Sequence, residues 1–293
     1  MRTLLTLFFL AFWTVPLTAQ VEAEILLEQD QFLRDEPVLV KVRITNRSGQ
    51  TLRLGEDNDW ISFVVDLNGS PAPMISEPAV AAPFELVSAH VATREFNVQP
   101  WFQISSPGRY SVSATVRIKQ WDRQVPAKAK PFEITRGARL WEQEVGLPTA
   151  AGVPETRRFI LQQANYRKQL KLYVRVSNEP DNVAFQVLPL GPLVSFGRPE
   201  AQVDEQSHLH VLFQTGARSF QYNIISPNGV LTTRQTFDYA LNRPTLRMNE
   251  NGKIVVAGGS RRIAASDLPS ATAPSATAPK EAAPKEDVGP AAK

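Results

Sequence analysis

The sequence predicts an all-β protein made of two successive antiparallel β domains, and two observations carry this prediction. Residues 24–135 alternate apolar and polar side chains with a period of two between turn residues, which is the pattern of short antiparallel strands. Further along, a segment that begins at Arg198 recurs without a gap at Arg243, 45 residues later. Both copies read as a strand, an acidic-amide turn and a second strand, so the chain after residue 156 is predicted to contain repeated hairpins.

Residues 1–19 predict a secretory signal peptide. One positive charge at Arg2 precedes an apolar run from Leu4 to Leu17, and the small residues Thr18 and Ala19 follow. The run is too short to remain as a membrane span, and no later segment approaches ~18 consecutive apolar residues. We therefore expect an exported protein, periplasmic or extracellular, cleaved after Ala19 or at the second small-residue site at Ala23, with no membrane span.

The sequence contains no cysteine. This excludes a disulfide, a thiolate metal site, a thiol nucleophile and a lipidated N-terminal cysteine. Small secreted animal domains usually depend on disulfides, so the absence of cysteine favours a bacterial envelope protein.

The first predicted domain, residues 24–135, reads as about seven strands in about 110 residues, which is typical of a β-sandwich. Val38, Val40, Val42 and Ile44 share one face of a strand that ends in a turn. Further strands are predicted at 61–67, 110–119 and 127–134.

Three segments carry a resemblance. Asp35-Glu36-Pro37, the turn Asn46-Arg47-Ser48-Gly49 and the strand start Pro107-Gly108-Arg109-Tyr110 resemble bacterial Ig-like or fibronectin-like accessory domains, with Asp35 where those domains carry Gly. The resemblance implies an Ig-like sandwich that acts as a spacer or binder and carries no catalytic residues. Tyr110 stands where a corner hydroxyl would reach back to the backbone, although an ordinary core aromatic would fit there as well.

Residues 136–156 read as a linker with one short strand near 140–145, because Gly and Pro punctuate them. Residues 157–263 read as a β-repeat domain with units at 157–197 and 198–242 and a half unit at 243–263. Their strand layout resembles the blades of sialidase-like and WD-type propellers, without the sequence boxes of either. A propeller needs a ring of at least four blades, and two and a half units cannot close one. The sheets therefore either pack on each other as an open sandwich or need a second copy of the chain to close the ring.

Residues 264–293 form an Ala/Pro/Lys-rich tail with almost no large apolar side chains. Such a segment cannot bury enough surface to offset the entropy of ordering, so it is predicted to be disordered.

Candidate chemistry is sparse. His208 and His210 lie two apart on a predicted strand, which is the spacing of a metal pair, and Asp204 is the nearest carboxylate. Without a third strong ligand we expect no metal site, and we expect both histidines on a solvent-facing strand edge. No nucleophile elbow, His-Glu-x-x-His or phosphate loop occurs, so we predict no catalytic residues and no cofactor.

Two surfaces remain as candidate binding sites. A basic run without acids is a candidate anion-binding surface, although it also reads as a solvated hairpin face; its members are Arg157, Arg158, Arg167, Lys168, Lys171 and Arg175. Trp101, Phe102 and Trp121 are candidate ligand-contacting aromatics, with core or rim packing as the alternative.

These observations predict an exported, non-enzymatic binding or scaffolding protein of the bacterial envelope. Its partner would be a protein or a glycan, with no role for nucleic acid, and self-association would occur through the open β repeats. The alternative is a glycan-processing enzyme or an enzyme accessory module that uses the face of the β repeats.

Overall fold

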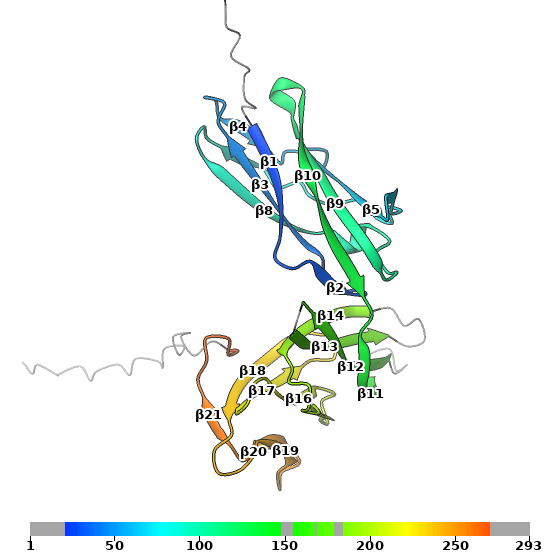
Figure 1. Ribbon diagram of the computed structural model, residues 1–293, viewed down its shortest axis with the longest axis vertical. Coiled ribbons are helices and arrows are strands. Elements are labelled where there is room, and N and C mark those ends of the chain that lie inside the picture. Colours follow the sequence, from blue (N-terminus) through cyan, green and yellow to red (C-terminus); the bar gives the residue numbers. More distant parts are fainter. Residues whose placement is uncertain (1–20, 148–154, 168, 179–183, 270–293) are drawn as a thin grey trace, which may run out of the picture. The chain divides into compact units, whose positions relative to one another are not determined.

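The computed structural model describes residues 21–147, 155–167, 169–178 and 184–269 (Figure 1). Apart from two 3-10 turns, η1 (Gln99–Trp101) and η2 (Lys119–Trp121), the regular structure in these ranges is β, which confirms the all-β prediction. In the same ranges, no helix has the length and apolar character needed to cross a membrane. The predicted signal peptide and residues 270–293 of the predicted tail lie outside the described residues.

The described chain divides into two compact units, one up to Ala138 and one from Arg139 onward, with Gln186–Leu188 grouped with the first. The strands of the first unit are β1 (Val21–Leu27), β2 (Gln31–Leu33), β3 (Leu39–Asn46), β4 (Leu52–Leu54), β5 (Ile61–Leu67), β6 (Ser70–Pro71), β7 (Phe84–Leu86), β8 (Val91–Asn97), β9 (Gly108–Ile118) and β10 (Arg123–Thr135).

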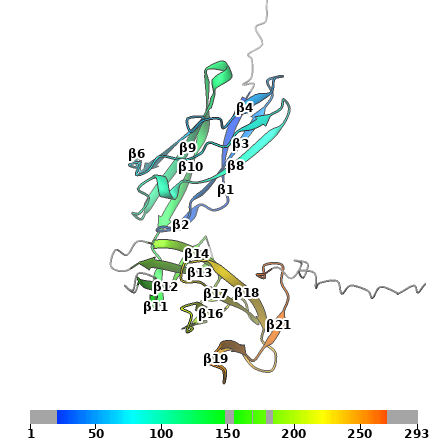
Figure 2. The same ribbon diagram turned by 180° about the vertical axis from the view of Figure 1, so that it is seen from behind.

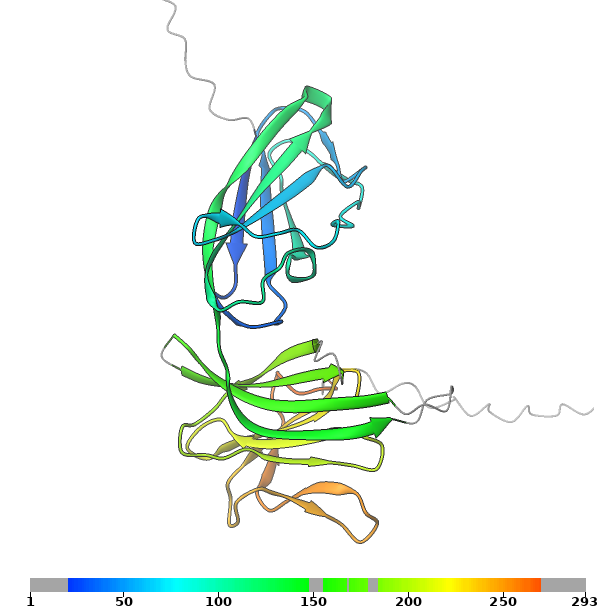
Figure 3. The same ribbon diagram turned by 90° about the vertical axis from the view of Figure 1, so that its right-hand side faces the viewer.

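The first unit has two main sheets, ordered β1-β3-β8 and β2-β10-β9-β5-β6, and a small β4-β7 pair. The pairings are antiparallel except that β2 runs parallel to β10. Figure 3 shows the two sheets as layers, and their inward faces share one core. In β3, Val40, Val42 and Ile44 are fully buried, as the alternating pattern predicted.

Both readings that the sequence left open for Tyr110 hold, because its hydroxyl makes the corner and its ring belongs to the core. Its hydroxyl donates to the carbonyl of Ser106 at 2.8 Å, and its ring stacks on Phe132 with centroids 5.4 Å apart. Burial raises the pKa of the Tyr110 hydroxyl above its ordinary value. The hydrogen bond fixes the chain where it enters the central strand β9.

The second unit contains β11 (Ala138–Leu147), β12 (Glu155–Tyr166), β13 (Gln169–Asn178), β14 (Ala184–Pro192), β15 (Glu200–Val203), β16 (Leu209–Gln214), β17 (Ser219–Ile225), β18 (Leu231–Asp238), β19 (Thr245–Met248), β20 (Ile254–Ala257) and β21 (Ser260–Arg262). Two meandering sheets, β11-β12-β13-β14 and β15-β16-β17-β18-β21, hold most of them, and β19-β20 forms a separate pair (Figure 2). The described strands form no closed propeller.

The structure has a strand where the sequence predicted a short one within the linker. β11 contains residues 140–145 and extends beyond them at both ends, as a ten-residue edge strand beside β12. Residues 148–154 of the predicted linker lie outside the described residues.

The sequence repeat is a repeat of structure. β15 and β19 occupy equivalent positions 45 residues apart, and β16 and β20 begin at equivalent residues. The side-chain oxygen of Asp204 accepts from the backbone N–H of Gln206 (3.0 Å) and His208 (2.8 Å). Asn249 does the same for Asn251 (3.1 Å) and Lys253 (2.8 Å).

Each turn also places one residue in the left-handed region, Ser207 at φ 61° and Gly252 at φ 73°. Burial differs between the copies, however. Leu209 and Ile254 are both buried, but Met248 is 66% exposed while its counterpart Val203 is half-buried. The second hairpin therefore keeps the geometry of the first without all of its packing.

The first residues of the predicted tail belong to the folded unit. Asp267 is only 3% exposed, and its carboxylate accepts from Arg261 (2.8 Å) and from the backbone of Ala264 (3.0 Å). Leu268 exchanges backbone hydrogen bonds with Arg234 of β18 at 2.9 and 3.0 Å. The described fold thus extends to residue 269, because a buried carboxylate and a strand-like bridge hold this segment.

Candidate functional site

A pocket of about 190 Å³ lies at one end of the first unit, where β4, the start of β5 and the end of β9 come together. Trp60 and Leu54 lie at its base but are only 3% and 2% exposed, and charged side chains surround them. Its lining residues are Arg53, Leu54, Gly55, Glu56, Asp57, Trp60, Arg117, Lys119 and Gln120.

Local hydrogen bonds hold the wall of this pocket in place. Gly55 adopts φ +81°, and a Cβ there would lie 2.1 Å from the carbonyl oxygen of Ala82, so only glycine allows the close approach. Asn58 accepts from the backbone N–H of Val80 (3.0 Å) and Ala81 (2.9 Å). The indole of Trp60 donates to the carbonyl of Val80 at 2.9 Å. The pocket is therefore preformed.

The rim carries both signs of charge. Arg117 donates to Asp59 at 2.8 Å, and Lys119 contacts both Asp59 (3.1 Å) and Asp57. The hydrogen bond from Lys119 lowers the pKa of Asp59, and those to Asp57 and Asp59 raise the pKa of Lys119. These pairs are solvent-exposed, so they add little stability and remain available to exchange partners.

A second pocket of about 270 Å³ shares Arg53, Leu54 and Glu56 with the first and extends to Phe84 and Glu85. Each is smaller than the ~300–1,000 Å³ typical of a site that encloses a small molecule. Their size suits a protruding side chain or a single sugar ring on a larger partner.

The predicted aromatic residues are not brought together. Phe102 is 3% exposed and belongs to the core of the first unit, so it offers no face to a ligand. Trp101 packs on Phe63 with ring centroids 5.6 Å apart. Trp121 is half-buried beside the pocket residue Gln120, and its indole donates to Gln50 at 3.3 Å.

The basic run does not form one continuous cationic surface. Arg158 pairs with Glu142 (3.2 Å) and Glu144 (2.6 Å) of β11. Arg157 is buried and donates to Glu155 and Asn178 at 2.6 and 2.7 Å. Glu142 and Glu144 lie on the neighbouring strand β11, and Glu155 lies two residues before Arg157. None of these acids belongs to the run itself, so the sequence of the run does not reveal them.

The remaining basic residues are dispersed. Arg175 is buried in β13, whereas Lys171 and Arg167 lie over the ring of Tyr166 at 3.7 and 5.3 Å from its centroid. Lys168 lies outside the described residues. The anion-binding surface therefore stays a prediction, with two of its arginines, Arg157 and Arg175, buried.

The histidines differ from the expectation of a solvent-facing edge. His210 is 5% exposed and lies between Asp204 (Nε2–Oδ2 3.0 Å) and the hydroxyl of Tyr222 (Nδ1–Oη 2.6 Å). His208 is half-buried with Nδ1 3.5 Å from Asp204. The sequence reading failed here because the face opposite Leu209 and Val211 is covered as well, by the β19–β20 hairpin.

Asp204 is ionised in this arrangement. Burial opposes its charge, but the hydrogen bonds from His210 and from the backbone of His208 outweigh it, so the pKa of Asp204 lies below its usual value. Burial, with Asp204 nearby, raises the pKa of Tyr222 to about 12. In the described ranges no three His, Asp or Glu side chains gather as a metal site.

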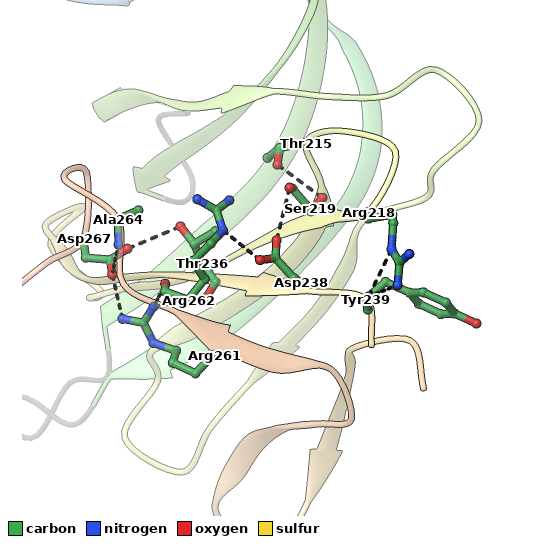
Figure 4. Close-up of polar contacts among 10 residues, drawn as sticks. All are labelled: Thr215, Arg218, Ser219, Thr236, Asp238, Tyr239, Arg261, Arg262, Ala264 and Asp267. Carbon is green, nitrogen blue, oxygen red and sulfur yellow. Dashed lines mark hydrogen bonds and ion pairs between the residues drawn. The ribbon is translucent and has the colours of Figure 1, made fainter. Parts of the chain in front are cut away.

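A further polar network lies where β17, β18 and β21 meet (Figure 4). Arg262 donates to Asp238 at 2.8 Å, and Ser219 donates to the same carboxylate at 3.3 Å. Arg261 bridges to Asp267, which also accepts from Thr236 at 3.3 Å. These contacts join strand edges and the segment after β21, so they account for the network as a structural element.

Comparison with known proteins adds little. No protein-family model and no curated protein matches the chain. Among solved structures, the chain is similar to Spo0M, a sporulation control protein from Bacillus subtilis, at 10% identity and a TM-score of 0.28, covering 59% of this chain and 90% of that one. The similarity is distant and indicates neither a family nor a shared activity.

The pocket in the first unit was missed by sequence reasoning. Its signal is the stretch from Gly55 to Trp60, where a glycine, three acids and a tryptophan interrupt the strand pattern. Nothing in that stretch reveals that Arg117 and Lys119, some 60 residues later, complete the rim.

Proposed function

We propose that this chain is an exported, non-enzymatic binding or scaffolding protein of the bacterial envelope, whose Ig-like first unit contacts a protein or glycan partner at the pocket lined by Trp60. The observation that carries the proposal is the preformed pocket pair with its mixed-charge rim. Loop ends of β-sandwiches commonly carry binding sites.

Several features support the assignment. The two-sheet core and the Tyr110 corner agree with the Ig-like resemblance. The small volume of each pocket, about 190 and 270 Å³, favours contact with a large partner over enclosure of a substrate. The sequence pattern of residues 1–19 supports export.

A glycan array, read together with an assay for product release, tests the proposal. We expect binding without turnover, and we expect the double substitution Arg117→Ala with Lys119→Ala to weaken it at least about tenfold. Arg247→Ala, an exposed arginine on β19, is the matched control and should bind like the wild type. Turnover of a bound glycan would favour the alternative of a glycan-processing enzyme, and binding unaffected by the double substitution would remove the pocket from the proposal.

The location is tested separately. N-terminal sequencing of exported material should begin at Gln20 or Glu24, whereas an intact Met1 on cytoplasmic protein would contradict export.

A further inference from the structure

Neither outer edge of the β19–β20 hairpin has a strand beside it in the described part of the chain. In the first copy of the repeat, β16 pairs with β15 on one side and with β17 on the other. In the second copy, β20 pairs with β19 only, and no other described strand joins this sheet. Gly258 and Gly259, both at positive φ, turn the chain away toward β21, which pairs with β18 instead.

The backbone groups at this edge can be identified. Leu246 N–H donates to the carboxylate of Glu200 at 2.7 Å, so it points away from β20. Residues opposite one another in an antiparallel pair point their N–H and C=O groups the same way, inward or outward, and this alternates along the strand. Val256 lies opposite Leu246, so the backbone groups of Val256 and Ile254 point outward from β20.

The two edges of the hairpin are not equivalent. Glu200 covers the outward N–H of Leu246 on β19, which is how proteins commonly protect an edge. No comparable hydrogen bond to the outward groups of β20 is found in the described part of the chain. Val255, between them, is 38% exposed and lies opposite Arg247, away from the core that Ile254 helps to form.

We propose that β20 pairs with β20 of a second copy of this chain, antiparallel about a two-fold axis through Val255. This register places Ile254 opposite Val256 of the other copy, and the outward groups of both residues then form complete hydrogen-bonded pairs. Val255 faces Val255 in the intervening non-hydrogen-bonded pair. The joined hairpins make one four-stranded sheet, as many strands as β11-β12-β13-β14.

The pattern of side chains selects a second copy as the occupant. The same register sets Lys253 opposite Ala257, so no like charges meet across the axis. Pairing of one edge with itself is isologous and closes at two chains, which leaves no further edge of this strand to extend. Only four residues of each chain take part, so the dimer is expected to be weak. Because this interface lies in the second unit, it is independent of the function proposed for the first.

A single cysteine at the axis tests the proposal, since the natural chain has none. In the chain from Gln20 to Lys293, Val255→Cys places two sulfurs at a non-hydrogen-bonded pair, where Cα atoms lie ~4.5 Å apart, within disulfide range. We expect mild oxidation to convert most of this variant into a disulfide-linked dimer on non-reducing gels. Val230→Cys is the control, because Val230 is more exposed at 57% and lies in a turn of the same unit.

A second variant separates strand pairing from random collision. Val256→Pro removes an outward N–H without removing a hydrogen bond of the hairpin, so adding it to Val255→Cys should lower the cross-linking rate about tenfold or more. Thermal unfolding confirms that each variant is folded. The proposal is overturned if folded Val255→Cys cross-links no faster than Val230→Cys, or if a folded double variant cross-links as fast as Val255→Cys alone.

Discussion

Asp204 acts at two places through one side chain. One oxygen accepts two backbone N–H groups of its own turn, and the other accepts from His210. Asn249 performs only the first role in the second copy of the hairpin. Comparing the two turns therefore separates two contributions to stability, that of the hydrogen bonds within the turn and that of the carboxylate charge on Asp204.

Asp204→Ala should lower the free energy of unfolding by about 1–3 kcal/mol, because it leaves backbone and imidazole groups without their partner. Asp204→Asn should cost less, because the amide oxygen still closes the turn as it does at Asn249. Urea unfolding at pH 7 measures both. Equal losses for the two variants would mean that the turn contributes nothing.

Tyr222 makes the stability of the second unit decline at alkaline pH. Its hydroxyl has a pKa raised to about 12 against an ordinary value near 10, so the folded state retains the proton while the unfolded state loses it. This contribution to stability is complete below pH 10 and declines as the pH rises toward 12. Tyr222→Phe should remove that part of the decline, which denaturant unfolding between pH 9 and 12 would detect. An unchanged slope would contradict the assignment. The pKa of Tyr110 is raised as well, so Tyr110 contributes the same decline to both proteins and does not affect their difference.

At the scale of the element, the repeated turns differ in how well their left-handed residue fits. Gly252 adopts φ 73° without cost, whereas Ser207 holds φ 61° with a side chain. Gly252→Val should lower the free energy of unfolding by about 1 kcal/mol or more, and Ser207→Gly should lower it less or raise it. Chemical denaturation of both variants checks the order. The reverse order would show that the two turns are not equivalent.

The segment after β21 should behave as part of the fold up to residue 269. A chain ending after Pro269 is expected to melt like the full chain, whereas one ending after Ile263 should melt several degrees lower, because it loses Asp267 and the Leu268 bridge. Asp267→Ala in the full chain should reproduce much of this loss. Equal melting temperatures for the two truncations would show that this segment adds no stability.

At the scale of the whole molecule, the first unit contains its own core. All the buried residues of that core lie between Val21 and Ile134. We therefore expect residues 20–137 to fold alone and to unfold in one cooperative transition, which circular dichroism with thermal melting would show. A fragment without cooperative unfolding would mean that the first unit depends on the rest of the chain.

The sequence alone determined the all-β character, the face of β3 that forms the core and the register of the repeated hairpins. These features depend on local periodicity and on turn residues, which act over a few positions along the chain. The equivalence of Asp204 and Asn249 could be seen in sequence because both turns need the same side-chain oxygen at the same offset.

Only the tertiary structure decided which polar residues meet. Arg158 finds its acids on β11, His210 is covered by the hairpin β19–β20, and the pocket of the first unit joins residues some 60 positions apart. Charge pairing and burial act through space, so a basic run looks unneutralised and a histidine looks exposed until the neighbouring strand is placed. The same holds for the edge of β20, since whether a strand has a partner depends on where the chain goes after Gly259.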